Sequence, residues 1–217
     1  MDWKGIIFDM DGTLLDSMIY WRRIGSICLK YFGKEPREAD FDRRIYRMSN
    51  EQIIRIFAEY GMTFQNRQDY VNTYYAAIKP YYEKVKPLDG VPEFLKKMQE
   101  KGERMCVATA TRSDVAIPVL ERLDLMKYFE FLLCCDDVGA GKDKPDIYLR
   151  AAEKLGYPVA ETLVMEDALY CVRTAKHAGF PVIGVMDRTA DPEEIAGMRK
   201  ESDRFIESYA EILEDLK

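Results

Sequence analysis

The chain has 217 residues, 47% of them hydrophobic and 32% charged, which is the composition of a globular protein with a sizeable core. Its formal charge of -6 disfavours phosphate backbones and anionic lipid, so we expect no nucleic-acid and no membrane partner. No apolar run approaches the ~20 residues of a membrane span, and the N-terminus lacks the basic start of a secretion signal. These features predict a cytoplasmic protein.

The cysteine and histidine content limits the kinds of catalytic and metal sites that the chain can form. Five cysteines, an odd number, occur without a Cys-x-x-Cys pair, which predicts reduced thiols. The one histidine, His177, lies just before Gly179 at the expected end of a helix, and no catalytic residue types surround it. Any metal is therefore expected to be a hard, oxygen-liganded ion such as Mg2+.

Short apolar runs alternate with helical patterns along most of the chain. The first run, at residues 4–9, is typical of a buried parallel strand. Similar runs follow at residues 104–109, 131–134, 162–165 and 181–185. Helices are predicted at residues 91–101, 114–123, 145–155 and 168–178, with a last strand and helix within 204–216. This alternation predicts an α/β fold with a doubly wound parallel sheet.

One region departs from the alternation. After residue 16 the pattern is helical, with candidate helices at residues 17–32, 49–60 and 67–85 and no convincing strand. We therefore expect a helical domain at residues 16–86, inserted into an α/β domain formed by residues 1–15 and 87–217. The insert has 13 Lys and Arg residues against 9 Asp and Glu residues. The rest of the chain has 19 basic residues against 29 acidic ones. A basic lobe of this kind favours the steering of an anionic substrate.

Reactive side chains gather where the first strand should end. Asp9 and Asp11, in the run FDMDGTLLDS, share one face of an extended chain because they are two residues apart. Gly12 permits a tight turn, and its N–H can approach an anion. Taken alone, Asp-x-Asp-Gly is equally typical of a polar exit from a strand.

Other strand ends change that balance. Thr109 ends the second strand, and Lys142 lies just before a helix. The acidic pair Glu166-Asp167 ends a later strand. Parallel strands bring their carboxyl ends to one edge of a sheet, where ligands bind. A carboxylate nucleophile, carboxylates for Mg2+, a lysine and a hydroxyl together fit phosphoryl transfer through an aspartyl phosphate.

The ordered set of four motifs resembles the haloacid dehalogenase-like (HAD) superfamily of hydrolases, in the subfamily with a helical cap after the first motif. That subfamily includes phosphoglycolate phosphatases and β-phosphoglucomutases. The resemblance covers nearly the full length and implies a Rossmann-like core, a helical cap domain and a phosphatase of a small phosphorylated metabolite. It implies that Asp9 attacks phosphorus and that Asp11 is the general acid and base. It also implies that Thr109 and Lys142 bind the phosphoryl oxygens.

The resemblance further implies a Mg2+ site. Its ligands would be Asp9, the backbone carbonyl of Asp11, and Asp167, with Glu166 acting through water. The aspartate at position 11 also favours phosphate esters, since relatives that cleave phosphonates or halides carry another residue there.

The lysine motif departs from the usual Gly-Lys-Pro-x-Pro-Asp of the family. Aligned on Pro145-Asp146, the chain has Asp143 at the place of the first proline. This alignment selects Lys142 as the phosphate-binding lysine and leaves Lys144 as the alternative.

Substrate contacts are expected from the first motif, the second motif and the insert. The candidates are Gly12, Thr13, Tyr20, Trp21, Arg47, Ala110 and Arg112. Sugar phosphomutases of the family resemble one another in a histidine and an arginine of the cap, where this chain has Trp21 and Asn50. These departures favour hydrolysis and leave a β-phosphoglucomutase-like phosphomutase as the alternative.

A receiver-type phospho-accepting signalling module is a more remote alternative. It uses a similar sheet and similar residue types, but its acidic pair comes first and no helical insert follows its first strand. We expect the protein to act as a monomer.

Overall fold

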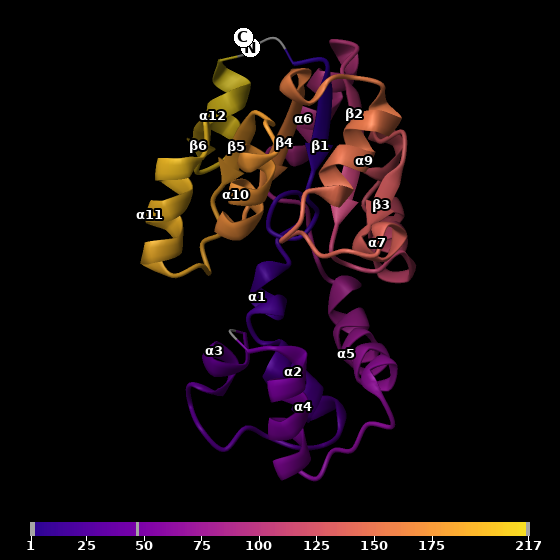
Figure 1. Cartoon of the computed structure of the whole chain (residues 1–217), viewed down its shortest axis with the longest axis vertical. Helices are drawn as coiled ribbons and strands as arrows, with labels where there is room; N and C mark the ends of the chain where they lie inside the picture. The colour runs from indigo at the N-terminus through magenta and orange to yellow at the C-terminus, as the bar shows by residue number, and fades with distance from the viewer. Residues whose placement is uncertain (1–2, 47, 216–217) are drawn as a thin grey trace. The chain divides into compact units, whose positions relative to one another are not determined.

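The computed structural model describes residues 3–46 and 48–215. The chain divides into two compact units, Met1–Asp16 with Lys86–Lys217, and Ser17–Val85 (Figure 1). We call them the α/β unit and the helical unit. Where the chain leaves and re-enters the α/β unit, the two segments run side by side. The Asp16 N–H donates to the Lys86 carbonyl over 3.0 Å, and Leu15 pairs antiparallel with Pro87.

The α/β unit is built on a six-stranded, fully parallel sheet. In the order β3-β2-β1-β4-β5-β6, the strands are β3 Leu132–Cys134, β2 Arg104–Thr109, β1 Gly5–Phe8, β4 Thr162–Glu166, β5 Val182–Val185 and β6 Arg204–Ile206. All residues of β1 are buried, as expected for a central strand with both faces covered. The predicted doubly wound α/β fold is confirmed.

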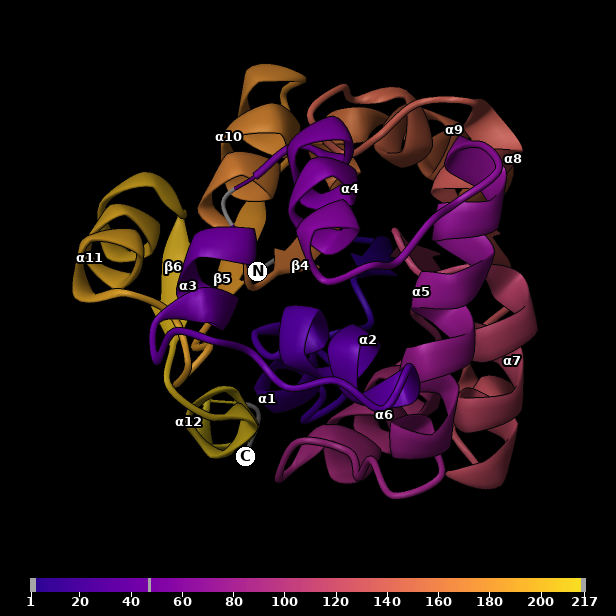
Figure 2. The ribbon, with the colours of Figure 1, turned by 90° about the horizontal axis from the view of Figure 1, so that it is seen from below.

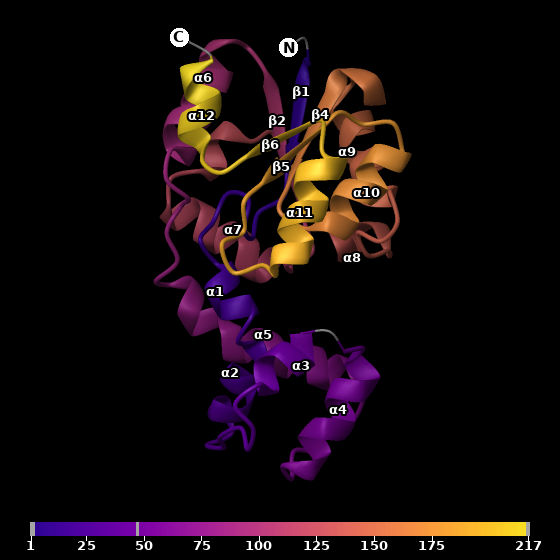
Figure 3. The same cartoon turned by 90° about the vertical axis from the view of Figure 1, so that its left-hand side faces the viewer.

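Helices cover both faces of this sheet (Figure 3). One face carries α6 Val91–Glu100, α7 Ser113–Arg122 and α12 Tyr209–Glu214. The other carries α8 Cys135–Val138, α9 Asp146–Leu155, α10 Leu169–His177 and α11 Pro192–Glu201. Two short 3-10 helices, η1 Met126–Tyr128 and η2 Val159–Glu161, complete the unit. No helix among the described residues is long and apolar enough to cross a membrane.

Helix α9 shows how the sequence positions the site. It starts after Pro145, whose fixed φ suits a helix start, and stops at Gly156, whose φ of 79° closes it in the left-handed region. Its buried residues recur at helical spacing and pack into the core beneath β1 and β2. The loop before α9 carries Lys142, and the buried face of α9 carries Tyr148.

The helical unit contains α1 Met18–Trp21, α2 Ile24–Tyr31, α3 Phe41–Tyr46, α4 Asn50–Glu59 and α5 Arg67–Tyr82. Within it, α2 lies between α3 and α5 (Figure 2). The helix predicted at residues 17–32 is in fact two helices, because the chain leaves helical geometry at Arg23, whose φ is -114° and ψ is 14°.

Helix α3 was not predicted, and tertiary contacts explain it. A Cβ on Gly25 of α2 would lie 3.0–3.1 Å from three side chains of α3, so glycine permits this close approach. The carboxylate of Asp42 accepts hydrogen bonds from the Ser26 N–H and hydroxyl, over 2.7 and 2.6 Å. These contacts connect segments 16 residues apart, which local periodicity does not register.

Candidate active site

The carboxyl ends of the three central strands bring the predicted motifs to one edge of the sheet. Asp9 directly follows β1, and its N–H donates to the carbonyl of Met165 in β4 over 2.9 Å. Thr109 is the last residue of β2, and Glu166 is the last residue of β4, with Asp167 next. All four predicted side chains are buried, with at most 6% of their residue surface exposed.

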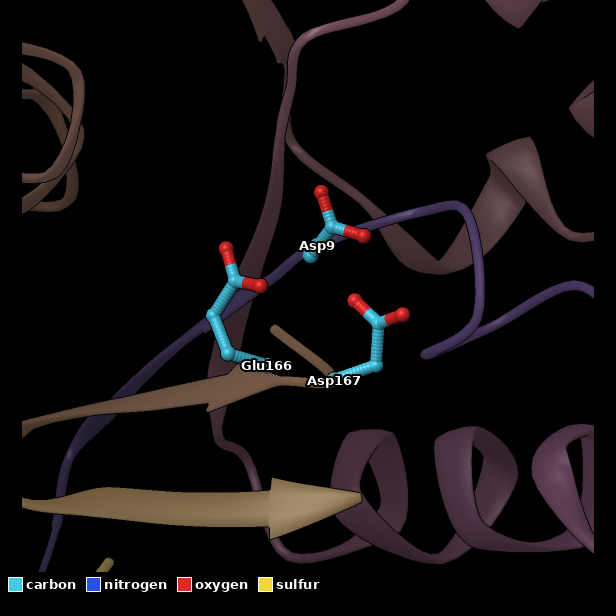
Figure 4. Close-up of side chains that lie close together, drawn as sticks. All are labelled: Asp9, Glu166 and Asp167. Carbon is cyan, nitrogen blue, oxygen red and sulfur yellow. The ribbon is translucent and has the colours of Figure 1, made fainter. Parts of the chain in front are cut away.

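Asp9, Glu166 and Asp167 form an acidic cluster (Figure 4). Each offers a carboxylate oxygen, and these oxygens all lie within 4.8 Å of one another. No other group of three or more potential metal-ligating side chains was found within residues 3–46 and 48–215. An all-oxygen donor set with excess negative charge suits a hard divalent cation, so these residues fit the magnesium that the family resemblance implies. The side chain of Asp11 is not part of this cluster.

Lys142 is the positive charge of the site. Its buried ammonium contacts Asp9 Oδ1 and donates to Glu166 Oε1 over 2.6 Å. Lys144, two residues on, is exposed, and the short turn there is closed by a bond from its N–H to the Gly141 carbonyl. Of the two lysines considered from the sequence, the structure therefore places Lys142 against the proposed nucleophile.

Burial shifts the proton affinities of the cluster. It raises the pKa of Asp9 to about 8; Lys142 opposes this shift, while the charges of Glu166 and Asp11 add to it. Burial, followed by the charge of Asp9, likewise holds the pKa of Asp167 well above its usual range. Burial alone would lower the pKa of Lys142, but the Asp9 and Glu166 carboxylates outweigh it and raise that pKa. Negative charge thus exceeds positive charge here, as expected at a cation site.

Asp11 and Thr109 are linked by a residue that the sequence did not single out. Thr111 is buried, and its hydroxyl donates to Asp11 Oδ2 over 2.7 Å. Its N–H donates to Thr109 Oγ1 over 3.0 Å. One residue therefore orients both a predicted general acid and a predicted phosphate-binding hydroxyl.

The turn after Asp11 corrects one detail of the prediction. Gly12 has a φ of 83°, which confirms the tight turn, but its N–H donates to the Leu15 carbonyl over 2.9 Å. That N–H is already used within the turn and is not aimed at an anion. Thr13 is fully buried, its hydroxyl has no hydrogen-bond partner in the described structure, and its carbonyl accepts from Tyr209.

The remaining described candidates for substrate contact make contacts with other side chains of the protein or are exposed. The Arg112 guanidinium forms a two-pronged ion pair with Asp114, over 3.0 and 3.2 Å, and Ala110 is exposed. In the helical unit, Tyr20 packs on Tyr81, and the Trp21 indole N–H donates to Tyr82 over 2.7 Å. These are contacts within their own units. Arg47 lies outside the described residues.

Two residues near the carboxyl ends of the strands, Tyr148 and Asp187, were not predicted from the sequence. Tyr148 donates to Glu166 Oε1 over 2.7 Å. Asp187 is buried two residues beyond β5, and its charge adds to the raised pKa of Asp167. Its Oδ1 accepts from the N–H and hydroxyl of Thr189, over 2.7 and 2.6 Å. An acid shortly after a predicted strand was the available signal for Asp187; Tyr148 had none.

The geometry brings carboxylate, lysine and threonine side chains together at the edge of a parallel sheet, and comparison with known proteins gives the family. The model of haloacid dehalogenase-like hydrolases matches residues 6–185. The chain belongs to this family, which confirms the resemblance deduced from the four motifs and the prediction of an enzyme. The match spans the helical insert as well as the sheet up to β5, and it leaves the receiver-module alternative without support.

Individual relatives agree with this class. A phosphorylated carbohydrates phosphatase of Thermotoga maritima is 31% identical over 91% of this chain and 99% of its own. The N-acetylmuramic acid 6-phosphate phosphatase of Pseudomonas aeruginosa is 26% identical over 88% of this chain and 85% of its own. A solved Thermotoga maritima structure, described as a candidate beta-phosphoglucomutase, has a TM-score of 0.79 and 27% identity, covering 99% of this chain and 100% of that one. Family and relatives together support the phosphoric monoester hydrolase class.

Proposed function

We propose that the protein is a Mg2+-dependent phosphatase of a small phosphorylated metabolite, acting through an aspartyl phosphate on Asp9. The observation that carries this proposal is the position of Asp9. It lies buried at the end of the central strand, with the Lys142 ammonium on Oδ1 and the carboxylates of Glu166 and Asp167 close by. When bound by Asp9, Asp167 and the backbone carbonyl of Asp11, Mg2+ would offset the repulsion between carboxylate and phosphate.

Asp9 acts as the nucleophile. One of its oxygens forms a bond to phosphorus while the bond from phosphorus to the ester oxygen breaks. Lys142 and Thr109 bind the non-bridging oxygens of the phosphoryl group. Thr109 Oγ1 accepts from the Thr111 N–H, so the threonine's own hydroxyl proton points elsewhere and is suited to a phosphoryl oxygen.

Asp11 moves the protons. It donates a proton to the leaving ester oxygen and then takes one from the water that attacks the aspartyl phosphate. The bond between phosphorus and Asp9 breaks in this second step, which releases inorganic phosphate and the free carboxylate. Thr111 holds Asp11 by its Oδ2 and fixes the orientation of the carboxyl group.

The helical unit is proposed to be a cap that sets substrate specificity. Its excess of Lys and Arg suits an anionic substrate. Substrate contacts by Tyr20, Trp21 and Arg47 remain proposals. We further propose a cytoplasmic monomer, a compartment in keeping with the five cysteines, which are free thiols.

The test is phosphate release from a panel of phosphate monoesters with Mg2+. Asp9→Asn removes the nucleophile and is expected to lower kcat by a factor of about 10^4 or more, because the covalent route is closed. Asp16→Asn is the matched control, since Asp16 is exposed and its substitution should change kcat less than about twofold. Full turnover by Asp9→Asn would reject the covalent mechanism.

A sugar phosphomutase is the second candidate, favoured by the likeness to the Thermotoga maritima structure described above. It would use the same attack by Asp9 but pass the phosphoryl group to a bisphosphate. Incubation with a sugar 1-phosphate and a trace of the bisphosphate, followed by NMR of the products, separates the two. Trp21 and Asn50, at the places of the mutase histidine and arginine, favour release of inorganic phosphate.

A further inference from the structure

Tyr148 contacts the proposed catalytic machinery without a role in the mechanism above. It lies in α9, is fully buried, and its hydroxyl donates to Glu166 Oε1 over 2.7 Å. The same oxygen accepts from Lys142 Nζ over 2.6 Å. Tyr148 and Lys142 therefore share one acceptor, and Lys142 in turn contacts Asp9.

The ring of Tyr148 is fixed independently of its hydroxyl. It packs edge-on against Phe180, with 6.2 Å between ring centroids, on the buried face of α9. The ammonium of Lys142 lies 5.7 Å from the centre of the same ring. Lys142 therefore lies near the ring of Tyr148 and shares an acceptor with its hydroxyl, and a phenylalanine would keep the ring while removing only the donor.

We propose that Tyr148 is a positioning residue that acts through Glu166 to hold Lys142 where it binds a phosphoryl group. This inference rests on the phosphate-binding role of Lys142 in the proposed function. A buried carboxylate that accepts two donors is fixed in one rotamer and shares its charge between them. Without the Tyr148 hydroxyl, the negative charge of Glu166 would attract Lys142 more strongly, and the Glu166 side chain would be less restrained. The ammonium would then be less available to a phosphoryl oxygen.

In this arrangement, Oε1 of Glu166 serves to hold the lysine rather than to bind a metal. Two short hydrogen bonds occupy that oxygen, and both donors are themselves buried. Glu166 thereby acts on the phosphate through Lys142. The effects of Tyr148 should accordingly appear in phosphate binding rather than in metal dependence.

The experiment compares Tyr148→Phe with the wild type, using inorganic phosphate as the probe. Calorimetric titration, with Mg2+ and in its absence, should give a Kd higher by about fivefold, which matches the net contribution of one typical hydrogen bond. The Mg2+ activation constant should change less than about twofold. Tyr60→Phe is the control, because this buried tyrosine also loses one hydrogen bond, from the Arg37 N–H over 3.0 Å, within the helical unit.

A double-mutant cycle tests whether Tyr148 acts through Glu166. In a Glu166→Ala background, Tyr148→Phe should weaken phosphate binding by less than about twofold, because the oxygen that accepts from Tyr148 is already gone. Independent, multiplying effects of the two substitutions would overturn the proposal, as would wild-type phosphate affinity in Tyr148→Phe. The binding measurement does not need turnover, so its outcome is separate from that of the monoester panel that tests the proposed function.

Discussion

The two units of the molecule differ in whether they bury charged side chains. Every charged side chain that is buried among the described residues belongs to the α/β unit: Asp9, Lys142, Glu166, Asp167 and Asp187. The buried residues of the helical unit are apolar or aromatic apart from Ser17, and its described charged side chains lie at least partly in solvent. Burial of an ion costs several kcal/mol unless partners compensate it, so such a cluster is a poor choice for stability alone.

This difference distinguishes an arrangement of side chains that serves chemistry from one that serves stability. In the α/β unit, one lysine faces an excess of carboxylates, and the raised pKa values of Asp9 and Asp167 record the unfavourable charge. In the helical unit, aromatic rings pack on one another around Trp21, with Tyr74, Tyr75 and Tyr82 as its neighbours. The first arrangement suits a reaction and the second suits a scaffold.

After the loss of the nucleophile in Asp9→Asn, the largest expected effect comes from removing the positive charge of the site. Lys142→Ala should lower kcat/KM by a factor of about 10^2 to 10^3, because phosphoryl charge loses a preorganised partner. Lys144→Ala is the matched control and should stay within about twofold, since Lys144 is exposed. Steady-state kinetics on one monoester decides the matter. A greater loss in Lys144→Ala would mean that the contact between Lys142 and Asp9 is not the functional one.

The acidic cluster should make the metal-free protein less stable as pH rises. The folded pKa of Asp9 is raised to about 8, above an ordinary value near 4, and that of Asp167 is raised as well. Between these values the folded state binds more protons than the unfolded state, so the free energy of unfolding falls with increasing pH. We expect a loss of about 2–4 kcal/mol between pH 5 and pH 8.

This expectation is measured by urea unfolding with a chelator present. Asp167→Asn should flatten the pH dependence and raise the stability of the metal-free protein at pH 8, because one buried negative charge is gone. Groups with lowered pKa, such as Asp203 beside Lys176, lose their stabilising effect only below the pH window used. Equal or rising stability of the wild type from pH 5 to pH 8 would contradict the raised pKa values.

The helical unit should respond to shape rather than to charge. Gly25→Ala places a methyl group 3.0–3.1 Å from three side chains of α3 and should lower the free energy of unfolding by about 1–3 kcal/mol. The chain has two tryptophans, Trp3 in the α/β unit and Trp21 in the helical unit, so single-tryptophan variants report each unit by fluorescence. The loss is expected in the signal of Trp21. Unchanged stability would contradict the close packing of α2 on α3.

The smallest expected effect concerns the orientation of Asp11. Thr111→Val keeps the shape and the backbone bond to Thr109 but removes the hydroxyl that donates to Asp11. We expect kcat to fall by about five- to tenfold, because Asp11 loses the hydrogen bond that fixes the orientation of its carboxyl group. Thr189→Val, which removes a similar hydroxyl from Asp187, is the control. An unchanged kcat in Thr111→Val would show that Asp11 acts independently of Thr111.

Several features of the site followed from local sequence. Asp9 and Asp11 lie at the end of a run typical of a buried strand, and strand ends in parallel sheets meet at one edge, so Thr109, Glu166 and Asp167 could be placed near them. The roles given to these residues remain predictions. Residues whose function depends on a distant partner escaped the sequence: Thr111 matters because of a residue 100 positions away, and Tyr148 because of Glu166.

The sequence by itself determined the fold class and the family, because strand and helix periodicity is local and the four motifs keep a fixed order. Tertiary structure decided how the side chains share their charges: which lysine contacts Asp9, which oxygen of Glu166 serves two donors, and that the Gly12 N–H is used within its own turn. It also decided that α3 exists, through its packing on Gly25. Hydrogen bonds and close contacts depend on distances in space, and one chain's order of residues does not encode those distances in any local pattern.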